Sequence, residues 1–267
     1  MKKIIVGFVL LVLCAGLLMG CGDADAYELY TQMMEAMNNV DSIDMDMTMK
    51  MDIDMAEFGT ISTVTTGNMK QVIRSETDID MLINMSTTMS GEGIPEETIP
   101  MTIYFTNGIM YTEMEMFGEA FRYGMAMSLE EAMEASMGIE MLDFAEDAIK
   151  DFNISTQGGN RKIEFTLDGG ALNSLIEQVS SSLVGMGIDP SDMSIDMGDV
   201  INEIEINSDG MLVSYRMIAD INMTMEMYGE TISMNMSMDS YMTVNSYNDV
   251  VINFPADLDE WEIIDMF

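Results

Sequence analysis

The sequence of 267 residues predicts an α+β fold. We expect a large curved antiparallel sheet of about ten or eleven strands, covered on one face by helices. Long runs of residues alternate between apolar and polar side chains, as expected of strands with one buried face. Other segments repeat their apolar residues at helical spacing, before the strands and between two groups of strands. Strands and helices do not alternate, and no linker rich in Pro or Ser divides the chain, so we expect a single domain.

The clearest strand signal is the segment 43–55, whose sequence is IDMDMTMKMDIDM. Every second residue is Ile or Met, and the residues between them are Asp, Thr or Lys. Successive side chains of a strand leave opposite sides of the sheet, so this pattern predicts a strand over 42–56 with methionines inward and acids in water. The same alternation returns near the C-terminus, over 217–227 and 232–238.

Further strands are expected between turns rich in Gly, Asn and Asp. Gly67 lies within one of them and predicts a bulge or a bend. Asn107-Gly108 is the strongest hairpin signal in the chain. Segments 91–100 and 185–199 are predicted as loops. The other expected strands cover residues 60–74, 77–89, 99–105, 109–116, 120–127, 153–156, 162–167, 201–206, 211–227 and 231–244.

Helices are expected before the first strand and between the two strand groups. Ser128, followed three residues later by Glu131, forms a capping-box signal for a helix start. The last expected helix has an apolar stripe that includes Leu175 and Val179. The predicted helices cover residues 26–40, 128–152, with a break at Gly138, and 168–186.

The N-terminus predicts export. Residues 1–20 place two lysines before an apolar run too short for a permanent membrane span, which indicates a signal peptide. The tetrapeptide LMGC, which ends at Cys21, resembles the lipobox of bacterial lipoproteins, in which the cysteine is diacylated and becomes the first mature residue. Cys21 is therefore expected to anchor the protein to the outside of the bacterial cell membrane. A short linker at 21–25 and one domain at 26–267 would follow.

The composition excludes several classes of function. The chain has 47 acidic and 10 basic residues, and a net charge of −37 argues against nucleic acid as a partner. Histidine is absent, and the only cysteines are Cys14 and Cys21, which excludes imidazole catalysis and Cys/His zinc sites. The sequence has no nucleophile elbow, SxxK motif or phosphate-binding glycine loop. We therefore predict no enzymatic activity and no cofactor.

The order of these features resembles that of the LolA/LppX-like lipoproteins of bacterial envelopes. The shared features are the lipobox-like N-terminus, the leading helix, the long alternating strands, the helical insert, the late hairpins and the closing segment VVINFP at 250–255. Uncharacterised lipoproteins of Gram-positive bacteria share this order. The resemblance spans most of 26–264 and includes no catalytic or binding motif. It implies an open half-barrel, closed by helices, that holds a lipid or a lipid anchor in an apolar cleft.

Methionine is the most unusual part of the composition, with 36 copies. Because its thioether side chain is unbranched and polarisable, a cleft lined by methionine could accept different acyl chains. The same residues could instead fill a closed core in place of Leu and Ile. The candidate cleft residues, predicted to contact a lipid or other apolar ligand, are Met45, Met47, Met49, Met51, Met81, Ile83, Met85, Met101, Ile103, Met223, Met225, Met234, Met236, Leu175 and Val179.

Two other functions stay open from the sequence. A structural or interaction module of the cell surface would have a closed core and present its acidic face to a partner. A Cu(I) binder would need two strands, such as 223–227 and 234–238, because side chains two residues apart on one strand are separated by ~6.6 Å. The acidic loop 189–199 could fold around a calcium ion. We assign no metal site, and no protein partner is identified.

Overall fold

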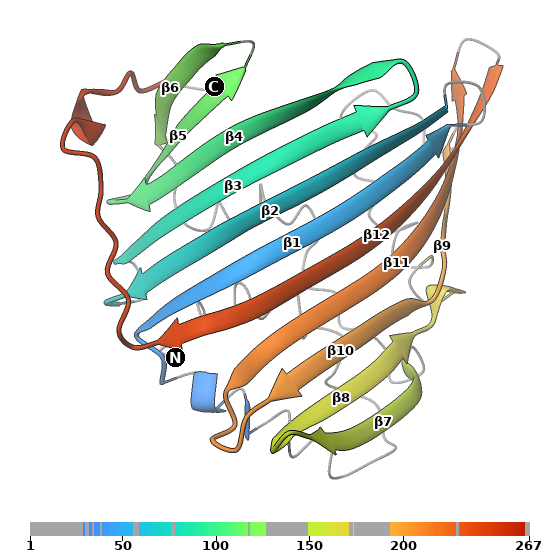
Figure 1. The fold of residues 1–267 in the computed structure, drawn as a ribbon, viewed down its shortest axis with the longest axis horizontal. Helices are drawn as coiled ribbons and strands as arrows, with labels where there is room; N and C mark the ends of the chain where they lie inside the picture. Colours follow the sequence, from blue (N-terminus) through green and yellow to red (C-terminus); the bar gives the residue numbers. More distant parts are fainter. Residues whose placement is uncertain are drawn as a thin grey trace.

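The long alternating segments form strands, and these join in one 12-stranded antiparallel sheet (Figure 1). The first and last strands, β1 and β12, pair in its middle. The spatial order is β6-β5-β4-β3-β2-β1-β12-β11-β10-β8-β7, and β9 pairs with β11. The computed structural model describes residues 39–55, 59–75, 78–116, 118–126, 149–170, 193–227 and 230–264, and positions 29, 32–33, 35–37 and 173. The strands are β1 (Ser42–Met55), β2 (Gly59–Ile73), β3 (Ile79–Gly91), β4 (Ile94–Thr106), β5 (Ile109–Met116), β6 (Glu119–Ala126), β7 (Ile149–Gln157), β8 (Asn160–Leu167), β9 (Met193–Met197), β10 (Val200–Ile206), β11 (Leu212–Met227) and β12 (Glu230–Tyr247).

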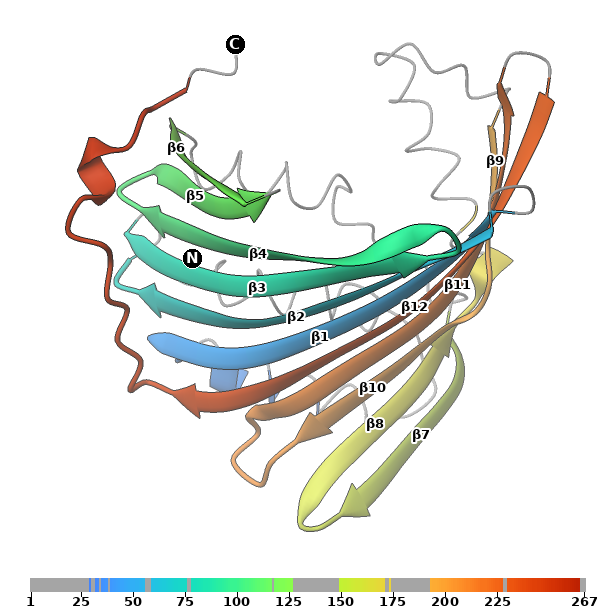
Figure 2. The ribbon, with the colours of Figure 1, turned by 45° about the horizontal axis from the view of Figure 1, so that its top comes forward.

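The sheet is strongly curved and twisted (Figure 2). Strands as long as β11, with 16 residues, and β12, with 18, cannot stay flat because each strand has a right-handed twist of its own. The alternation of β1 sets the two faces of the sheet. Met47 lies opposite Met242 of β12 and Gly67 of β2, and residues that face each other across antiparallel strands share a face. We call the side that carries Met47 the Met face and the opposite side the polar face.

The main core lies on the Met face, beneath the leading helix. Leu29, Met33 and Met37 recur at helical spacing and are 2%, 0% and 1% exposed. They belong to one buried cluster with the start of β1, the end of β12 and the inner residues of β8, β10 and β11. A Cβ added at Gly210, in the β10–β11 turn, would lie 3.5 Å from the Gln32 carbonyl oxygen, so the helix contacts this turn. The expected leading helix is thus present in the part of the chain described.

Residues 248–264, which we call the C-terminal strap, run from the end of β12 past the ends of β1 to β4 and reach β6 (Figure 1). The Gly124 amide donates to the Glu262 carbonyl oxygen at 2.7 Å, and the Ile264 amide donates to the Gly124 carbonyl oxygen at 2.9 Å. Leu258, in the 3-10 turn Leu258–Glu260, and Trp261 are buried against the polar face. The strap therefore pairs with the outer edge of β6 at Gly124.

The predicted α+β fold, with helices covering one face of the sheet, is wrong. Strands account for 73% and helices for only 7% of the residues described. One reason is that residues 149–152, predicted as the end of a helix, belong to β7, where Ile154 faces Ile163 of β8. Pairing with β8 outweighs helical spacing there, since tertiary contacts override local propensity. Gly169, Gly170 and Asn173 are helical, as predicted for 168–186, but the rest of that segment and 128–148 lie outside the described residues.

Three local predictions also need correction. The expected loop 91–100 is instead a turn followed by β4. Both prolines are compatible with a strand, because Pro95 lies in a β-bulge and Pro100 has no β5 partner among the described pairs. The expected loop 185–199 contains β9, whose pairing with the outer half of β11 satisfies backbone groups that β10 does not reach. Gly67 causes no bulge, since β1 and β2 stay in register through it. A Cβ there would lie 2.7 Å from the Asn84 carbonyl oxygen, so glycine allows β3 to approach closely.

Candidate ligand-binding face

The strand register brings the predicted cleft residues onto one face. A continuous row crosses the sheet through Met47, with one residue from each strand on the main path. Gly67 is its only residue without a side chain. From β7 to β6 the row is Ile154, Ile163, Ile204, Tyr215, Met242, Met47, Gly67, Met85, Met101, Met114 and Phe121.

The other candidates lie in neighbouring rows of the same face. Met45 faces Met69, which faces Ile83 and then Ile103. At the far end of the long strands, Met234 of β12 lies between Met55 of β1 and Met223 of β11. The remaining strand candidates, which the register also assigns to the Met face, are Met49, Met51, Met81 and Met236. The backbone of Met225 pairs with Ile232, and its side chain is outside the described part of the structure. Leu175 and Val179 lie outside the described residues.

Burial divides this face into two parts. Over β8 to β12 the row through Met47 is buried, with Ile204 1% exposed and Tyr215 5% exposed. From β1 to β5 the same row is only half-buried, and at β6 Phe121 is 45% exposed. Met45 and Met81 belong to the buried core. The half-buried candidates are Met47, Met49, Met51, Ile83, Met85, Met101, Ile103, Met223, Met234 and Met236.

Charged side chains are absent from the middle of the Met face in the described strands. The register assigns Glu97, Glu119 and Arg161 to this side, each close to the end of its strand. Two pairs of its uncharged polar residues are hydrogen-bonded to each other. The Tyr215 hydroxyl donates to Asn202 Oδ1 at 2.7 Å, and the hydroxyls of Thr65 and Thr87 lie 2.9 Å apart. The central part of this face therefore offers apolar contact rather than ionic binding.

Sequence reasoning missed Gln71, which is 0% exposed and has no hydrogen-bond partner for its side-chain nitrogen or oxygen. It faces Ile43 on one side and Met81 on the other, within the buried part of the Met face. The signal was available in the alternation along β2, because Gln71 is two positions from Met69 and four from Gly67, so all three share a face. The expected bulge at Gly67 hid this signal, because a bulge would have turned the following residues of the strand to the opposite face of the sheet.

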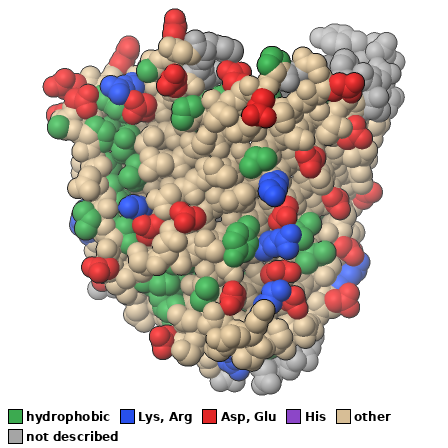
Figure 3. Space-filling model, in the orientation of Figure 1, with side chains coloured by type: hydrophobic (Ala, Val, Ile, Leu, Met, Phe, Trp, Pro, Cys, Tyr) green, Lys and Arg blue, Asp and Glu red, His purple; other side chains and the backbone are tan. Residues whose placement is uncertain are grey.

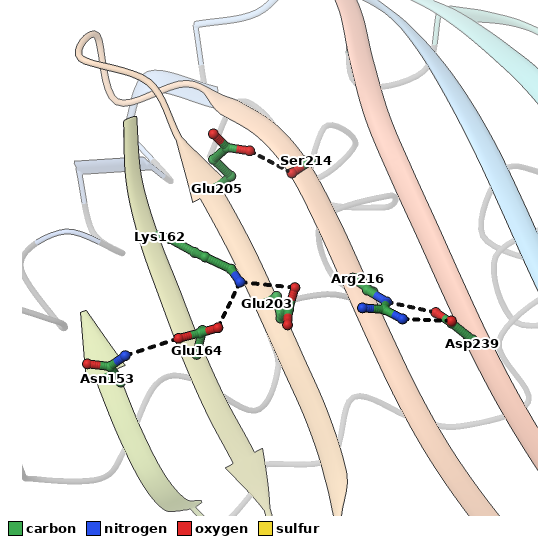
Figure 4. Close-up of polar contacts among 8 residues, drawn as sticks. All are labelled: Asn153, Lys162, Glu164, Glu203, Glu205, Ser214, Arg216 and Asp239. Carbon is green, nitrogen blue, oxygen red and sulfur yellow. Dashed lines mark hydrogen bonds and ion pairs between the residues drawn. The ribbon is translucent and has the colours of Figure 1, made fainter. Parts of the chain in front are cut away.

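The polar face carries charge, as the alternation of β1 predicts. Figure 3 shows acidic side chains and fewer basic ones spread between uncharged groups on this side. In Figure 4, Lys162 lies 2.7 Å from Glu164 and 3.2 Å from Glu203. Its hydrogen bond holds the pKa of the Glu164 carboxyl below the ordinary value, and Arg216 lowers the pKa of Asp239 in the same way. The pairs Lys162–Glu203 and Arg216–Asp239 connect neighbouring strands, whereas Lys162 and Glu164 lie on the same strand. Ion pairs at a protein surface contribute little to stability.

The acidic residues form no metal site among the residues described. Asp199 accepts a hydrogen bond from Lys150 at 3.0 Å and another from the Gly169 amide at 3.1 Å. Asp196 accepts one from Asn173 at 2.9 Å. Two carboxylates of the expected calcium loop are thus engaged within the protein, and Asp189 and Asp192 lie outside the described residues.

The membrane anchor predicted at Cys21 lies outside the described residues. In the part of the chain that the structure describes, no helix has the length and apolar character needed to cross a membrane.

A comparison with curated proteins finds no match. Among solved structures, a β-barrel-like protein of the domain of unknown function DUF1849 from Brucella abortus is 8% identical, with 78% of this chain and 100% of that chain covered and a TM-score of 0.22. OpdQ of Pseudomonas aeruginosa is 11% identical, with 73% and 56% covered and a TM-score of 0.17. OccK9 (OpdG) of Pseudomonas aeruginosa is 10% identical, with 71% and 52% covered and a TM-score of 0.13. At these TM-scores the likeness carries no argument about fold or function. The family of unknown function DUF6612 matches residues 25–259, and the chain belongs to this family.

Proposed function

We propose that the protein is a membrane-anchored extracytoplasmic lipoprotein that binds a lipid or another apolar ligand on the Met face, over β1 to β5. The observation that carries this proposal is the change in burial along the row through Met47. The row is apolar from β7 to β6, yet only its β8 to β12 part is buried.

Apolar surface of this kind is costly to leave in water. Covering a half-buried methionine contributes on the order of 1 kcal/mol, so a ligand that contacts several of them gains a useful binding energy. Large contiguous apolar patches on proteins commonly mark binding sites. The β1 to β5 rows also lack charged residues in their centre, which suits an acyl chain and does not suit an ionic ligand.

The choice of side chains supports a ligand of variable shape. Met47, Met85 and Met101 lie on three different strands of one row, and each can change rotamer without moving its backbone. A face of branched Leu and Ile would hold one shape more rigidly. The lipobox-like sequence at Cys21 adds proximity to a bilayer, which is the nearest source of such ligands.

Native mass spectrometry of the mature protein, together with titration of a fluorescent fatty acid, tests this function. We expect a co-purifying lipid or saturable binding of the probe. Met85→Lys would place a charge in the centre of the apolar row and should abolish binding. Ser86→Lys, on the neighbouring residue and the opposite face, is the matched control and should bind like the wild type. The absence of both lipid and probe binding would overturn the function and leave a cell-surface interaction module.

A second candidate function is Cu(I) binding, favoured by the row of Met55, Met234 and Met223. These methionines lie on three adjacent strands, and Cβ atoms of facing residues are ~4.5–5.5 Å apart. Thioethers at this spacing could converge on a soft ion. Competition with a Cu(I) chelator should then show uptake that Met234→Leu removes and Met242→Leu, in the core, leaves intact. No uptake by the wild type would eliminate this function.

A further inference from the structure

Gln71 is an exception among the polar residues of the Met face. Its side chain is fully buried, and neither Nε2 nor Oε1 has a hydrogen-bond partner. Asn202, also on this face and 3% exposed, accepts from the Tyr215 hydroxyl and donates to the Val200 carbonyl oxygen at 3.2 Å. A buried amide without partners is costly, because its hydrogen bonds to water are lost and not replaced. The Gln71 side chain therefore has four unused hydrogen-bonding positions, two donor hydrogens and two acceptor lone pairs.

The residues that precede Gln71 on β2 form a strip of short side chains. This β2 strip consists of Thr63, Thr65 and Gly67, all on the Met face. Methionines stand on both sides of it: Met47, Met49 and Met51 on β1, and Met85 and Met89 on β3. An extended chain lying along the strip would therefore contact methionines of both neighbouring strands.

The β2 strip leads toward Gln71. Gly67 and Gln71 are four positions apart, which corresponds to ~13 Å along the strand. Met69 lies between them and is 4% exposed. Because methionine is unbranched and has several rotatable bonds, Met69 can turn aside without a change in the backbone. Met69 is thus the side chain on the Met face of β2 that lies between the β2 strip and the unpartnered amide.

We propose that Gln71 is a polar subsite that binds the uncharged ester or amide group at the end of an acyl chain, while the chain itself lies along the β2 strip. This inference rests on the proposed function and specifies the ligand class. Gln71 Nε2 donates to the ligand carbonyl oxygen, and Oε1 accepts from the ligand N–H or hydroxyl. A carboxylate is disfavoured, since the described residues place no basic side chain beside Gln71 on this face and burial penalises an unpaired charge.

The test compares head groups on chains of one length. Affinities of the full mature chain are measured by displacement of a fluorescent fatty acid, with monolauroylglycerol, lauramide, laurate and dodecane as competitors. The variants are Gln71→Met, which keeps the length of the side chain, Gln71→Leu as a second apolar replacement, and Lys70→Met as a control on the polar face of the same strand. We expect the wild type to bind the ester and the amide more tightly than dodecane, by about 5- to 150-fold. Gln71→Met should erase that preference and leave dodecane binding unchanged, while Lys70→Met should keep the preference.

Each outcome separates the two proposals. A wild type that binds dodecane as tightly as the ester, or a preference that survives in both Gln71 variants, would overturn the subsite and leave apolar binding intact. A wild type that binds none of the competitors would overturn the function itself. Should both variants fail to fold, the NMR resonance of the Gln71 side-chain amide in the wild type tests the polar subsite. It must shift with monolauroylglycerol and stay in place with dodecane, and an unchanged resonance would reject the subsite.

Discussion

The indole ring of Trp261 meets the ring of Tyr111 edge-on, with ring centroids 6.0 Å apart and an interplanar angle of 86°. The same indole meets Tyr104 at 6.0 Å and 83°, and the Arg122 guanidinium lies 5.4 Å from its centroid. Tyr104 and Tyr111 face each other across β4 and β5, so one side chain of the C-terminal strap joins three strands at this edge. Aromatic contacts of this geometry contribute ~0.5–1.5 kcal/mol each beyond the burial of area.

Trp261→Ala should therefore release the strap. We expect the free energy of unfolding to fall by ~3–5 kcal/mol, as for other buried Trp residues replaced by Ala. Urea unfolding followed by far-UV circular dichroism measures the loss, since the protein has only one Trp and its fluorescence disappears in the variant. Val251→Ala is the control, because Val251 is 70% exposed and should change stability by less than ~0.5 kcal/mol. Equal urea midpoints for wild type and Trp261→Ala would show that the strap contributes nothing to the free energy of unfolding.

Gly67→Ala should destabilise the centre of the sheet. The new Cβ would lie 2.7 Å from the Asn84 carbonyl oxygen and 3.2 Å from Met85 Cβ, and the carbonyl belongs to a backbone held on both sides by strands. We expect a loss of ~1–3 kcal/mol from overpacking, measured by thermal and urea unfolding. Thr66→Ala, on the polar face of the same strand, should cost much less. A Gly67→Ala variant as stable as the wild type would mean that β3 can move away from β2.

Stability at high pH should depend on Tyr247. Its hydroxyl donates to the Leu212 carbonyl oxygen at 2.5 Å, and burial raises the pKa of this phenol in the folded protein. In the unfolded chain a tyrosine ionises near pH 10. The unfolded state therefore loses its proton first, and the stability that Tyr247 contributes is complete below about pH 10 and declines above it.

We expect the wild type to lose about 1 kcal/mol between pH 10 and 11 through this residue, because half of the unfolded tyrosines are already ionised at pH 10. Tyr247→Phe has no such proton, so the difference in unfolding free energy between wild type and variant should narrow as the pH rises from 8 to 11. Urea midpoints at three pH values measure it. A difference in unfolding free energy that stays constant with pH would contradict a raised pKa for the buried Tyr247 phenol.

Oxidation by hydrogen peroxide should distinguish the two parts of the Met face. Met45 and Met69 are 0% and 4% exposed and should resist oxidation. Met85 and Met101 are half-buried and should form sulfoxides earlier. Peptide mapping by mass spectrometry at several reaction times gives the order. Addition of monolauroylglycerol should slow oxidation at Met85 and Met101, and equal rates at all four residues would contradict the division of the face.

The sequence predicts individual strands here better than it predicts the overall fold. Period two in residues 43–55 assigns every methionine of β1 to one face, because the facing of a strand residue depends only on its position within that strand. The Asn107-Gly108 hairpin is confirmed, with Thr106 facing Ile109 and positive φ angles of 53° and 73° at the two turn residues. Both signals are local, and local geometry is enough to fix them.

The errors arise where distant partners decide the structure. Ile149 and Phe152 fit one side of a helix, but β8 offers them Leu167 and Phe165 as facing partners, with a bulge between the two pairs. No local pattern reveals that choice. The same limit applies to the site, since the sequence assigns Met47 and Met85 to inward positions but cannot show that both face Gly67, from β1 on one side and from β3 on the other. Gln71 became a candidate only when burial and missing partners were known.

The pairing of β1 with β12 also determines the order in which the molecule can assemble. The Asp41 amide donates to Asn248 Oδ1, across a separation of 207 residues. During synthesis from the N-terminus, β1 can pair with β2 long before β12 exists, and closing so long a loop is slow. Until then β1 presents an open hydrogen-bonding edge to other nascent chains. Charged side chains along a strand discourage such pairing, so Asp44, Asp46, Lys50, Asp52 and Asp54 are well placed to protect this edge while the chain is incomplete.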